Sequence, residues 1–162
     1  MLRRVFRAAN AARLALVVHM RPSGAAARVF LDELLPVAPD VVVQVSHLAG
    51  GGGGALETAA EEALVVFAAA FASQDPRVRN LYFDVAGITG GADSAARAPV
   101  IAIRLRSIGA KHLLYGSDGG DPTDPSPKDA LEAFRKLPLT PAELRAIERN
   151  VAPYLKGSDP FF

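Results

Sequence analysis

The stretch Val41-Val42-Val43-Gln44-Val45-Ser46-His47 decides the fold class, because it is almost continuously apolar, rich in β-branched residues and ends at a histidine. Three more short runs of this kind occupy residues 14–18, 81–86 and 111–115. A nearly continuous apolar run is typical of a strand that is buried on both faces, as in a parallel sheet covered by helices. Four such strands are therefore expected.

Helical patterns separate the four runs and follow the last of them. They cover residues 28–35, 56–72, 93–108 and 126–137, and a final helix begins at the capping-box sequence that starts at Thr140 and carries Leu144, Ile147, Val151 and Tyr154 at helical intervals. An Arg-rich surface helix is expected over residues 1–13. Alternation of strand and helix predicts an α/β fold with a parallel sheet and right-handed crossovers.

Composition excludes several classes of protein. The chain has 162 residues, a net charge of +1 and no cysteine, which argues against a nucleic-acid binder held by bulk charge and against thiolate chemistry. Its longest apolar run, residues 63–72, is about half of the ~20 residues that a membrane-spanning helix needs. We expect one soluble, cytoplasmic domain over residues 1–162, with residues 157–162 as a tail, and neither a membrane nor a nucleic-acid partner.

Three polar residues follow the predicted strands at equivalent points. His19 follows the first strand, His47 the second, and Asp118 lies just after the fourth, within a Gly-Ser-Asp-Gly sequence. The carboxyl ends of parallel strands meet at one rim, where ligands bind in βα folds. Two imidazoles and a carboxylate suit a divalent metal such as zinc, or acid–base chemistry. The alternative is two structural histidines and a turn.

Other candidates are less specific. Arg21 and Ser23 lie just beyond His19, where they either bind an anionic substrate or belong to a solvated loop. Asp84, inside the third strand, either orients a site residue or bonds a backbone group. His112 starts its strand, at the opposite rim, and is expected to be structural. The glycines at 50–54 lack the Gly-Lys-Ser/Thr of a phosphate loop and are expected to allow close backbone approach or to form a mobile active-site loop.

Five segments in order resemble one known family. They are Leu16-Val17-Val18-His19-Met20, residues 43–50, residues 80–87, Leu114-Tyr115-Gly116-Ser117-Asp118 and residues 139–152 with Asn150. Together they are similar to the C-terminal half of the amidohydrolase-related (amidohydrolase 2) family of metal-dependent TIM-barrel hydrolases and decarboxylases. The resemblance implies half of a (βα)8 barrel, with the chain beginning inside the helix before the fifth strand.

The resemblance also implies roles for the rim residues. His19 would be a metal ligand, His47 a ligand or the residue that handles the catalytic water, and Asp118 a ligand and proton acceptor. The metal would be zinc, with manganese as the alternative. The His-x-His pair that the family carries after its first strand does not occur in this sequence.

The leading hypothesis is therefore a metal-dependent hydrolase or decarboxylase that acts on a small organic substrate, with a carboxylate group as one possibility. The alternative is an inactive half barrel that serves as an assembly module. A doubly wound phosphate-binding domain is a third reading. Because a half barrel has two open strand edges, we expect a second copy of the chain, or a separate polypeptide that carries the first half, to complete it.

Overall fold

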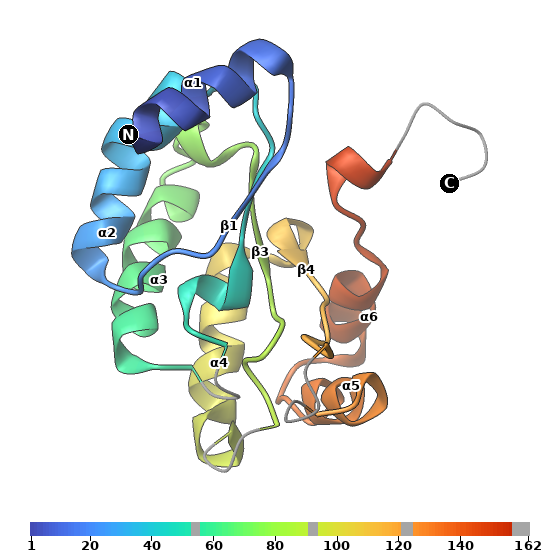
Figure 1. Cartoon of the computed structure of the whole chain (residues 1–162). Helices are drawn as coiled ribbons and strands as arrows, with labels where there is room; N and C mark the ends of the chain where they lie inside the picture. Colours follow the sequence, from blue (N-terminus) through green and yellow to red (C-terminus); the bar gives the residue numbers. More distant parts are fainter. Residues whose placement is uncertain (53–55, 91–93, 121–124, 157–162) are drawn as a thin grey trace.

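The computed structural model describes residues 1–52, 56–90, 94–120 and 125–156. Its centre is one parallel sheet of four short strands in the order β1-β2-β3-β4. The strands are β1 (Leu16–Val18), β2 (Val43–Val45), β3 (Leu81–Asp84) and β4 (Leu113–Leu114). All four predicted strands are confirmed, although each is shorter than its apolar run (Figure 1).

Helices precede β1 and follow every strand. The α-helices are α1 (Leu2–Ala12), α2 (Gly24–Val29), α3 (Thr58–Ala72), α4 (Ser94–Ile108), α5 (Pro127–Arg135) and α6 (Pro141–Arg149). A π-helical turn, η1 (Phe30–Leu34), extends α2, and short 3₁₀ turns are η2 (Leu35–Val37), η3 (Ser46–Ala49), η4 (Pro76–Val78), η5 (Ala110–His112) and η6 (Pro153–Leu155). The chain is thus a series of four βα units.

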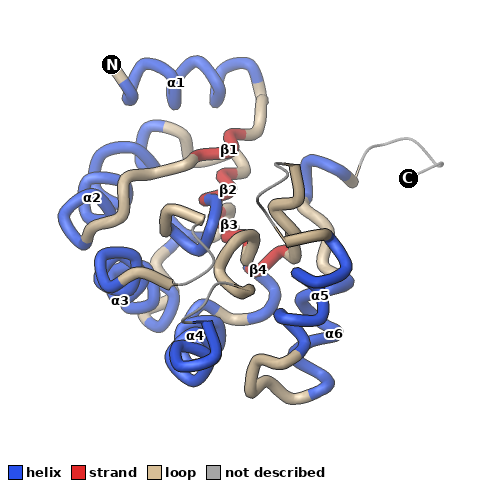
Figure 2. Tube along the Cα trace, turned by 60° about the horizontal axis from the view of Figure 1, so that its bottom comes forward, coloured by secondary structure: helices blue, strands red, loops and turns tan. Residues whose placement is uncertain are grey.

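The order of the strands decides between the two predicted α/β folds, the half barrel and the doubly wound sheet. Consecutive strands are neighbours, with Val17 beside Gln44 and Gln44 beside Tyr82 in the parallel register. A doubly wound sheet reverses its strand order at a switch point, and this sheet does not, so the third reading is wrong. Figure 2 shows α2, α3 and α4 wrapped around one side of the strands, as in part of a βα barrel.

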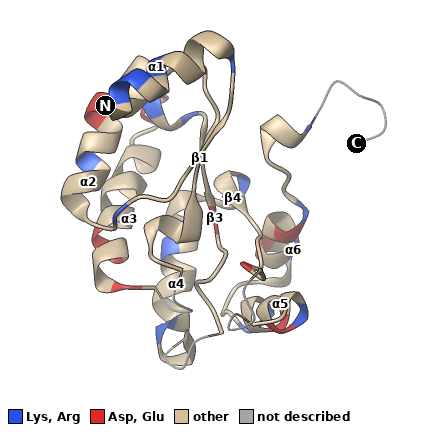
Figure 3. Cartoon of the chain, viewed as in Figure 1, with Lys and Arg blue, Asp and Glu red and all other residues tan. Residues whose placement is uncertain are grey.

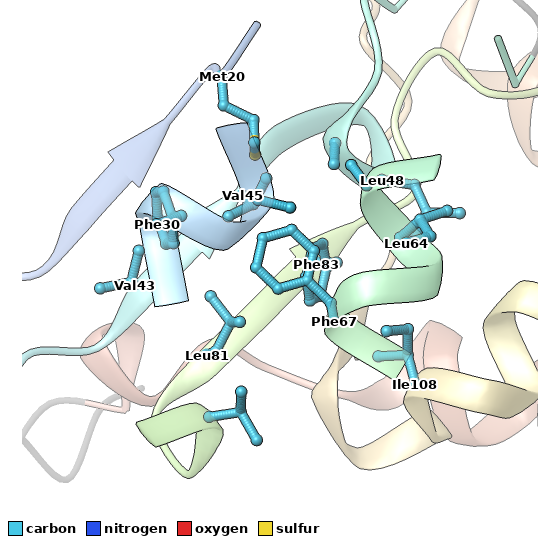
Figure 4. Close-up of a cluster of buried hydrophobic side chains, with 14 of the residues drawn as sticks. Met20, Phe30, Val43, Val45, Leu48, Leu64, Phe67, Leu81, Phe83 and Ile108 are labelled. Carbon is cyan, nitrogen blue, oxygen red and sulfur yellow. The ribbon is translucent and has the colours of Figure 1, made fainter. Parts of the chain in front are cut away.

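The two faces of the sheet differ in burial. Val43, Val45 and Phe83 point to the helix layer and are fully buried. Phe67 of α3 stacks edge-on against Phe83, with ring centroids 5.2 Å apart, and lies at the middle of this core (Figure 4). The opposite face carries Val17, which is 60% exposed, and Gln44. In a complete barrel that face would line the interior.

Capping residues set the starts of three helices. Thr140 and Glu143 form the predicted capping box of α6, and the Ser126 hydroxyl accepts a bond from the Asp129 amide at the start of α5. Ser23 accepts from the Ala26 amide and so begins α2 at Gly24. The prediction of a helix starting at residue 28 missed this turn, because residues 24–27 carry no large apolar side chain.

The last helix is shorter than predicted. In the structure α6 ends at Arg149, and Asn150 is extended, with φ −70° and ψ 134°. Pro153 disfavours helical backbone at the residue before it, so the helix does not continue to Tyr154. Tyr154 belongs to the separate turn η6 and does not share a helix face with Ile147. The side-chain amide of Asn150 donates to the carbonyls of Lys111 and Leu113, which ties the end of α6 to β4.

Charged side chains lie mostly on the helices (Figure 3). The strands hold one, Asp84 at the end of β3. The Arg-rich segment at the N-terminus is helix α1, as predicted, and it packs through Phe6 and Ala9. Among the described residues, no helix combines the length and the apolar character needed to cross a bilayer. The predicted tail, residues 157–162, lies outside the described residues.

Candidate active site

The folded chain brings the three predicted rim residues together. His19 follows β1 and His47 follows β2, and their rings meet edge to face with centroids 4.9 Å apart. An Asp118 oxygen, Oδ2, lies 3.7 Å from His47 Nδ1. The His47 side chain is 15% exposed and that of Asp118 36%. The sheet therefore places two imidazoles and a carboxylate at one rim, as the strand pattern predicted.

His47 stands on an unusual backbone. It has φ 55° and ψ 35°, and Leu48 and Ala49 also have positive φ. Left-handed backbone costs a residue with a side chain roughly 1–2 kcal/mol, so neighbouring groups must hold it. One of them is Asp84, whose Oδ1 accepts hydrogen bonds from the amides of His47 (2.9 Å) and Ala86 (3.2 Å).

The ring of His47 has a defined orientation. Its Nδ1 lies 3.0 Å from the carbonyl oxygen of Ala86. A carbonyl oxygen only accepts, so this contact assigns the proton to Nδ1 and leaves Nε2 of the neutral ring with a free lone pair. Asp118 lies on the Nδ1 side of the ring. The arrangement is suited to proton transfer through Nε2.

Two glycines form the wall around this pair. A Cβ on Gly52 would lie 3.0 Å from Cε1 and Nδ1 of His47, so the expected close approach of the glycine run is confirmed at this position. A Cβ on Gly87 would lie 2.6 Å from Asp118 Oδ2 and 2.7 Å from the Gly52 carbonyl oxygen. Both glycines have positive φ. The other expectation, a mobile loop, falls partly on residues 53–55, outside the described residues.

The site does not form a metal cage by itself. In the described ranges, no group of three or more His, Asp or Glu side chains is arranged to hold a metal ion. The hydrogen bond from His47 Nδ1 to Ala86 gives the physical reason, because only Nε2 remains to bind an ion while Asp118 lies on the other edge of the ring. Asp118 and the Nε2 of His47 thus lie at different edges of the ring, and the metal-ligand roles of His19, His47 and Asp118 stay predictions.

The remaining candidates have separate places. Arg21 is exposed two residues beyond His19, and its role in substrate binding stays a prediction. Ser23 caps α2, which fits a structural role. Asp84 accepts hydrogen bonds from backbone amides, which is one of the two roles predicted for it. One of these amides is that of His47. His112 is structural as predicted, since it is buried at the start of β4 with Nδ1 2.8 Å from the Leu81 carbonyl oxygen.

Two residues near the site were missed. Gln44 donates from Nε2 to Asp84 Oδ2 at 2.7 Å, and the Tyr154 hydroxyl donates to Gln44 Oε1 at 2.5 Å. Gln44 had a visible signal, because it interrupts an otherwise apolar strand. Tyr154 had none, since its contact spans 110 positions in the sequence.

Comparison with known proteins identifies the family. The sequence profile described as "Amidohydrolase" matches residues 1–152, nearly the whole chain. This chain is a member of the amidohydrolase family. The resemblance carried by the His19, His47 and Asp118 segments is thereby confirmed at the level of the family.

A solved structure supports the same fold for this chain. It is the 5-carboxyvanillate decarboxylase LigW from Sphingomonas paucimobilis, with a TM-score of 0.55 and 16% sequence identity. The match covers 88% of this chain and 49% of that chain, so this chain spans about half the length of the protein it resembles. A search of curated proteins finds no match. The four βα units thus correspond to half of a TIM barrel.

Proposed function

We propose that this amidohydrolase contributes the C-terminal half of the active site of a metal-dependent hydrolase or decarboxylase. The observation that supports it best is the state of His47, whose Nδ1 is engaged by the Ala86 carbonyl beside Asp118. This fixes one proton and leaves Nε2 as the acid–base atom at a rim where βα barrels carry their chemistry.

The same atom serves both reactions of the proposal. In hydrolysis, Nε2 takes a proton from water as the water oxygen bonds to the substrate carbonyl carbon, and returns that proton to the leaving group as the bond between this group and the carbonyl carbon breaks. In decarboxylation, Nε2 first takes up a proton from solvent water. The bond to the carboxylate carbon then breaks, carbon dioxide leaves, and the electron pair left on the substrate carbon takes that proton from Nε2. The Asp118 carboxylate stabilises the imidazolium in either case.

The metal in this proposal is zinc, with manganese as the alternative, and a bound ion would polarise substrate oxygens. The described residues do not hold such an ion alone. Ligands from beyond the matched half of the barrel would have to join His19 and Asp118. No proton step above depends on the ion.

The proposed substrate is a small carboxylate-bearing aromatic compound. The similar structure is a decarboxylase of such a compound, 5-carboxyvanillate. Arg21, exposed beside His19, provides a cation for a substrate carboxylate. For this chain, both the aromatic carboxylate substrate and the role of Arg21 are proposals.

The experiment is an assay of the purified protein on a panel of aromatic carboxylates and amides, with added zinc, with manganese and with a chelator. Release of carbon dioxide or of amine above the buffer rate supports the proposal and selects between decarboxylation and hydrolysis. If neither the chain alone nor the dimer that would close the barrel turns over any compound of the panel under any metal condition, the alternative of an inactive assembly module replaces it.

The open sheet motivates a partner as part of this proposal. Val17 of the edge strand β1 and Leu14, two residues before that strand, are about 60% exposed, and Leu14 also lines a groove of about 470 Å³ together with Tyr154. A second copy would place its β4 along β1 and close an eight-stranded barrel about a twofold axis. Sedimentation analysis at micromolar concentration should give the mass of a dimer. A monomer at that concentration would exclude the second copy.

A further inference from the structure

We infer that Asp84, Gln44 and Tyr154 form a positioning relay that holds His47 in its acid–base geometry and couples it to the C-terminal turn η6. The inference rests on the proposed function, because it assigns these residues to the support of His47. None of the three is proposed to touch the substrate. The relay is carried by a continuous chain of hydrogen bonds.

The hydrogen bonds of the relay converge on Asp84, which accepts from both ends. The Tyr154 hydroxyl donates to Gln44 Oε1, and Gln44 Nε2 donates to Asp84 Oδ2. Asp84 is a carboxylate with acceptor oxygens only, which fixes the orientation of the Gln44 amide. The other oxygen, Asp84 Oδ1, then accepts the amides of His47 and Ala86. Gln44 and Asp84 thus each have hydrogen-bond partners on both sides within the relay.

Asp84 holds both ends of the contact that orients the catalytic ring. Its Oδ1 binds the backbone of His47, and it also binds the backbone of Ala86, whose carbonyl accepts from His47 Nδ1. One buried carboxylate oxygen thereby sets the position of the ring donor and of its acceptor together. The His47 amide that it accepts belongs to the first of three successive residues with positive φ, His47 to Ala49.

Placement on the sheet argues for a role beyond stability. Gln44 is on the face opposite the helix-packed core, next to Val17 and Tyr82 in the register. Its strand neighbours Val43 and Val45 supply the buried packing, so the fold gains little apolar burial from position 44. The chain of hydrogen bonds that passes through Gln44 instead leads to His47. Burial and the nearby charge of Asp84 raise the pKa of Tyr154, which fits a neutral hydroxyl donor at the end of the relay.

The relay predicts a graded response to substitution. Asp84→Ala removes the acceptor for both amides, and Gln44→Leu and Tyr154→Phe each cut the chain further from His47. Asp84→Asn keeps one side-chain oxygen, which accepts the amides of His47 and Ala86. A flip of the Gln44 side-chain amide lets its Oε1 accept from the new NH₂ group at position 84. Its Nε2 then donates to the Tyr154 hydroxyl oxygen, so the chain of hydrogen bonds is kept. The matched control is Tyr82→Phe, which removes a hydroxyl from the neighbouring register position with no hydrogen bond among the described residues.

The first readout is hydrogen exchange of the His47 amide relative to the Val43 amide, which bonds the Asn80 carbonyl inside the sheet. Loss of a bond to a carboxylate should speed His47 exchange about tenfold relative to Val43. The second readout is the ¹⁵N signal of His47 Nδ1, which reports the bond to Ala86. Both should change most in Asp84→Ala, less in Gln44→Leu and Tyr154→Phe, and least in Asp84→Asn and Tyr82→Phe.

The outcomes separate this inference from the proposed function. If Gln44→Leu and Tyr154→Phe fold and leave both His47 readouts equal to those of Tyr82→Phe, the relay is wrong, whatever the activity. If Asp84→Ala does not fold, these two variants and Asp84→Asn still decide the question. If the His47 readouts change in the predicted order while the substrate panel shows no turnover, the relay stands and the proposed function fails.

Discussion

Gly87 offers a substitution that acts on the site through backbone geometry alone. Its φ is +62°, and a Cβ there would meet Asp118 Oδ2 at 2.6 Å and the Gly52 carbonyl oxygen at 2.7 Å. Real Cβ atoms do not approach so closely, and one of the two neighbours is backbone. Gly87→Ala must therefore push Asp118 away from His47 or shift the Gly52 segment.

The cost has two parts. Left-handed backbone at an alanine costs about 1–2 kcal/mol. The contact of His47 with the half-exposed Asp118 carboxylate contributes less than about 1 kcal/mol, because solvent screens it. A total near 2 kcal/mol lowers the midpoint of thermal unfolding by about 4–8 °C for a chain of this size.

Gly109→Ala is the matched control. Gly109 also has positive φ, at +91°, but a Cβ there has nothing within 4 Å. Both variants should lose thermal stability in differential scanning fluorimetry. Only Gly87→Ala should also perturb the ring signals of His47 and lower turnover, by about tenfold or more. If Gly87→Ala keeps wild-type ring signals and rate, then Asp118 has no part in the state of His47, and the description of the site is wrong.

Three other predictions concern the fold. Burial lowers the pKa of His112 below 6.5, so the stability that depends on its neutral form is present above pH 6.5 and declines as the pH falls; His112→Gln should flatten the slope of unfolding free energy between pH 7 and 5. Arg106 lowers the pKa of Glu143 to about 2, so the contribution of the ionised Glu143 to stability is present above pH 4.5 and is lost as the pH falls toward 2. Glu143→Gln should therefore reduce the pH dependence of the urea-unfolding midpoint between pH 4.5 and 2. Phe67→Ala should cost about 3–5 kcal/mol in urea unfolding, because Phe67 is fully buried against Phe83; a loss under 1 kcal/mol would contradict the core packing described.

The apolar runs were enough to predict that His19, His47 and Asp118 lie at one rim of the sheet, because the hydrophobic pattern of each strand and helix can be recognised from neighbouring residues alone. His19 and His47 directly follow apolar runs, and parallel pairing then brings their rings to 4.9 Å without further information. The position of His112 at the other rim followed from the same reasoning. The family motifs added the half-barrel topology, which local patterns alone left open to a doubly wound alternative.

Local patterns could not predict what depends on backbone torsion and distant contacts. No feature of residues 46–49 signals the positive φ of His47 and Leu48. That torsion places the His47 amide on Asp84 and its ring on Ala86, and so separates Asp118 from the free nitrogen that a metal would need. The departure of Tyr154 from its predicted helix had a local signal in Pro153, but its bond to Gln44 did not.

The central claim is that His47 transfers the proton in a reaction at this rim. The measurement that tests it most directly compares kcat/KM of the wild type, His47→Gln and His112→Gln on the best substrate of the panel. We predict a loss of about 100-fold or more for His47→Gln, as is usual for an acid–base group, and rates within a few-fold of wild type for folded His112→Gln. Equal rates for His47→Gln and the wild type would contradict it.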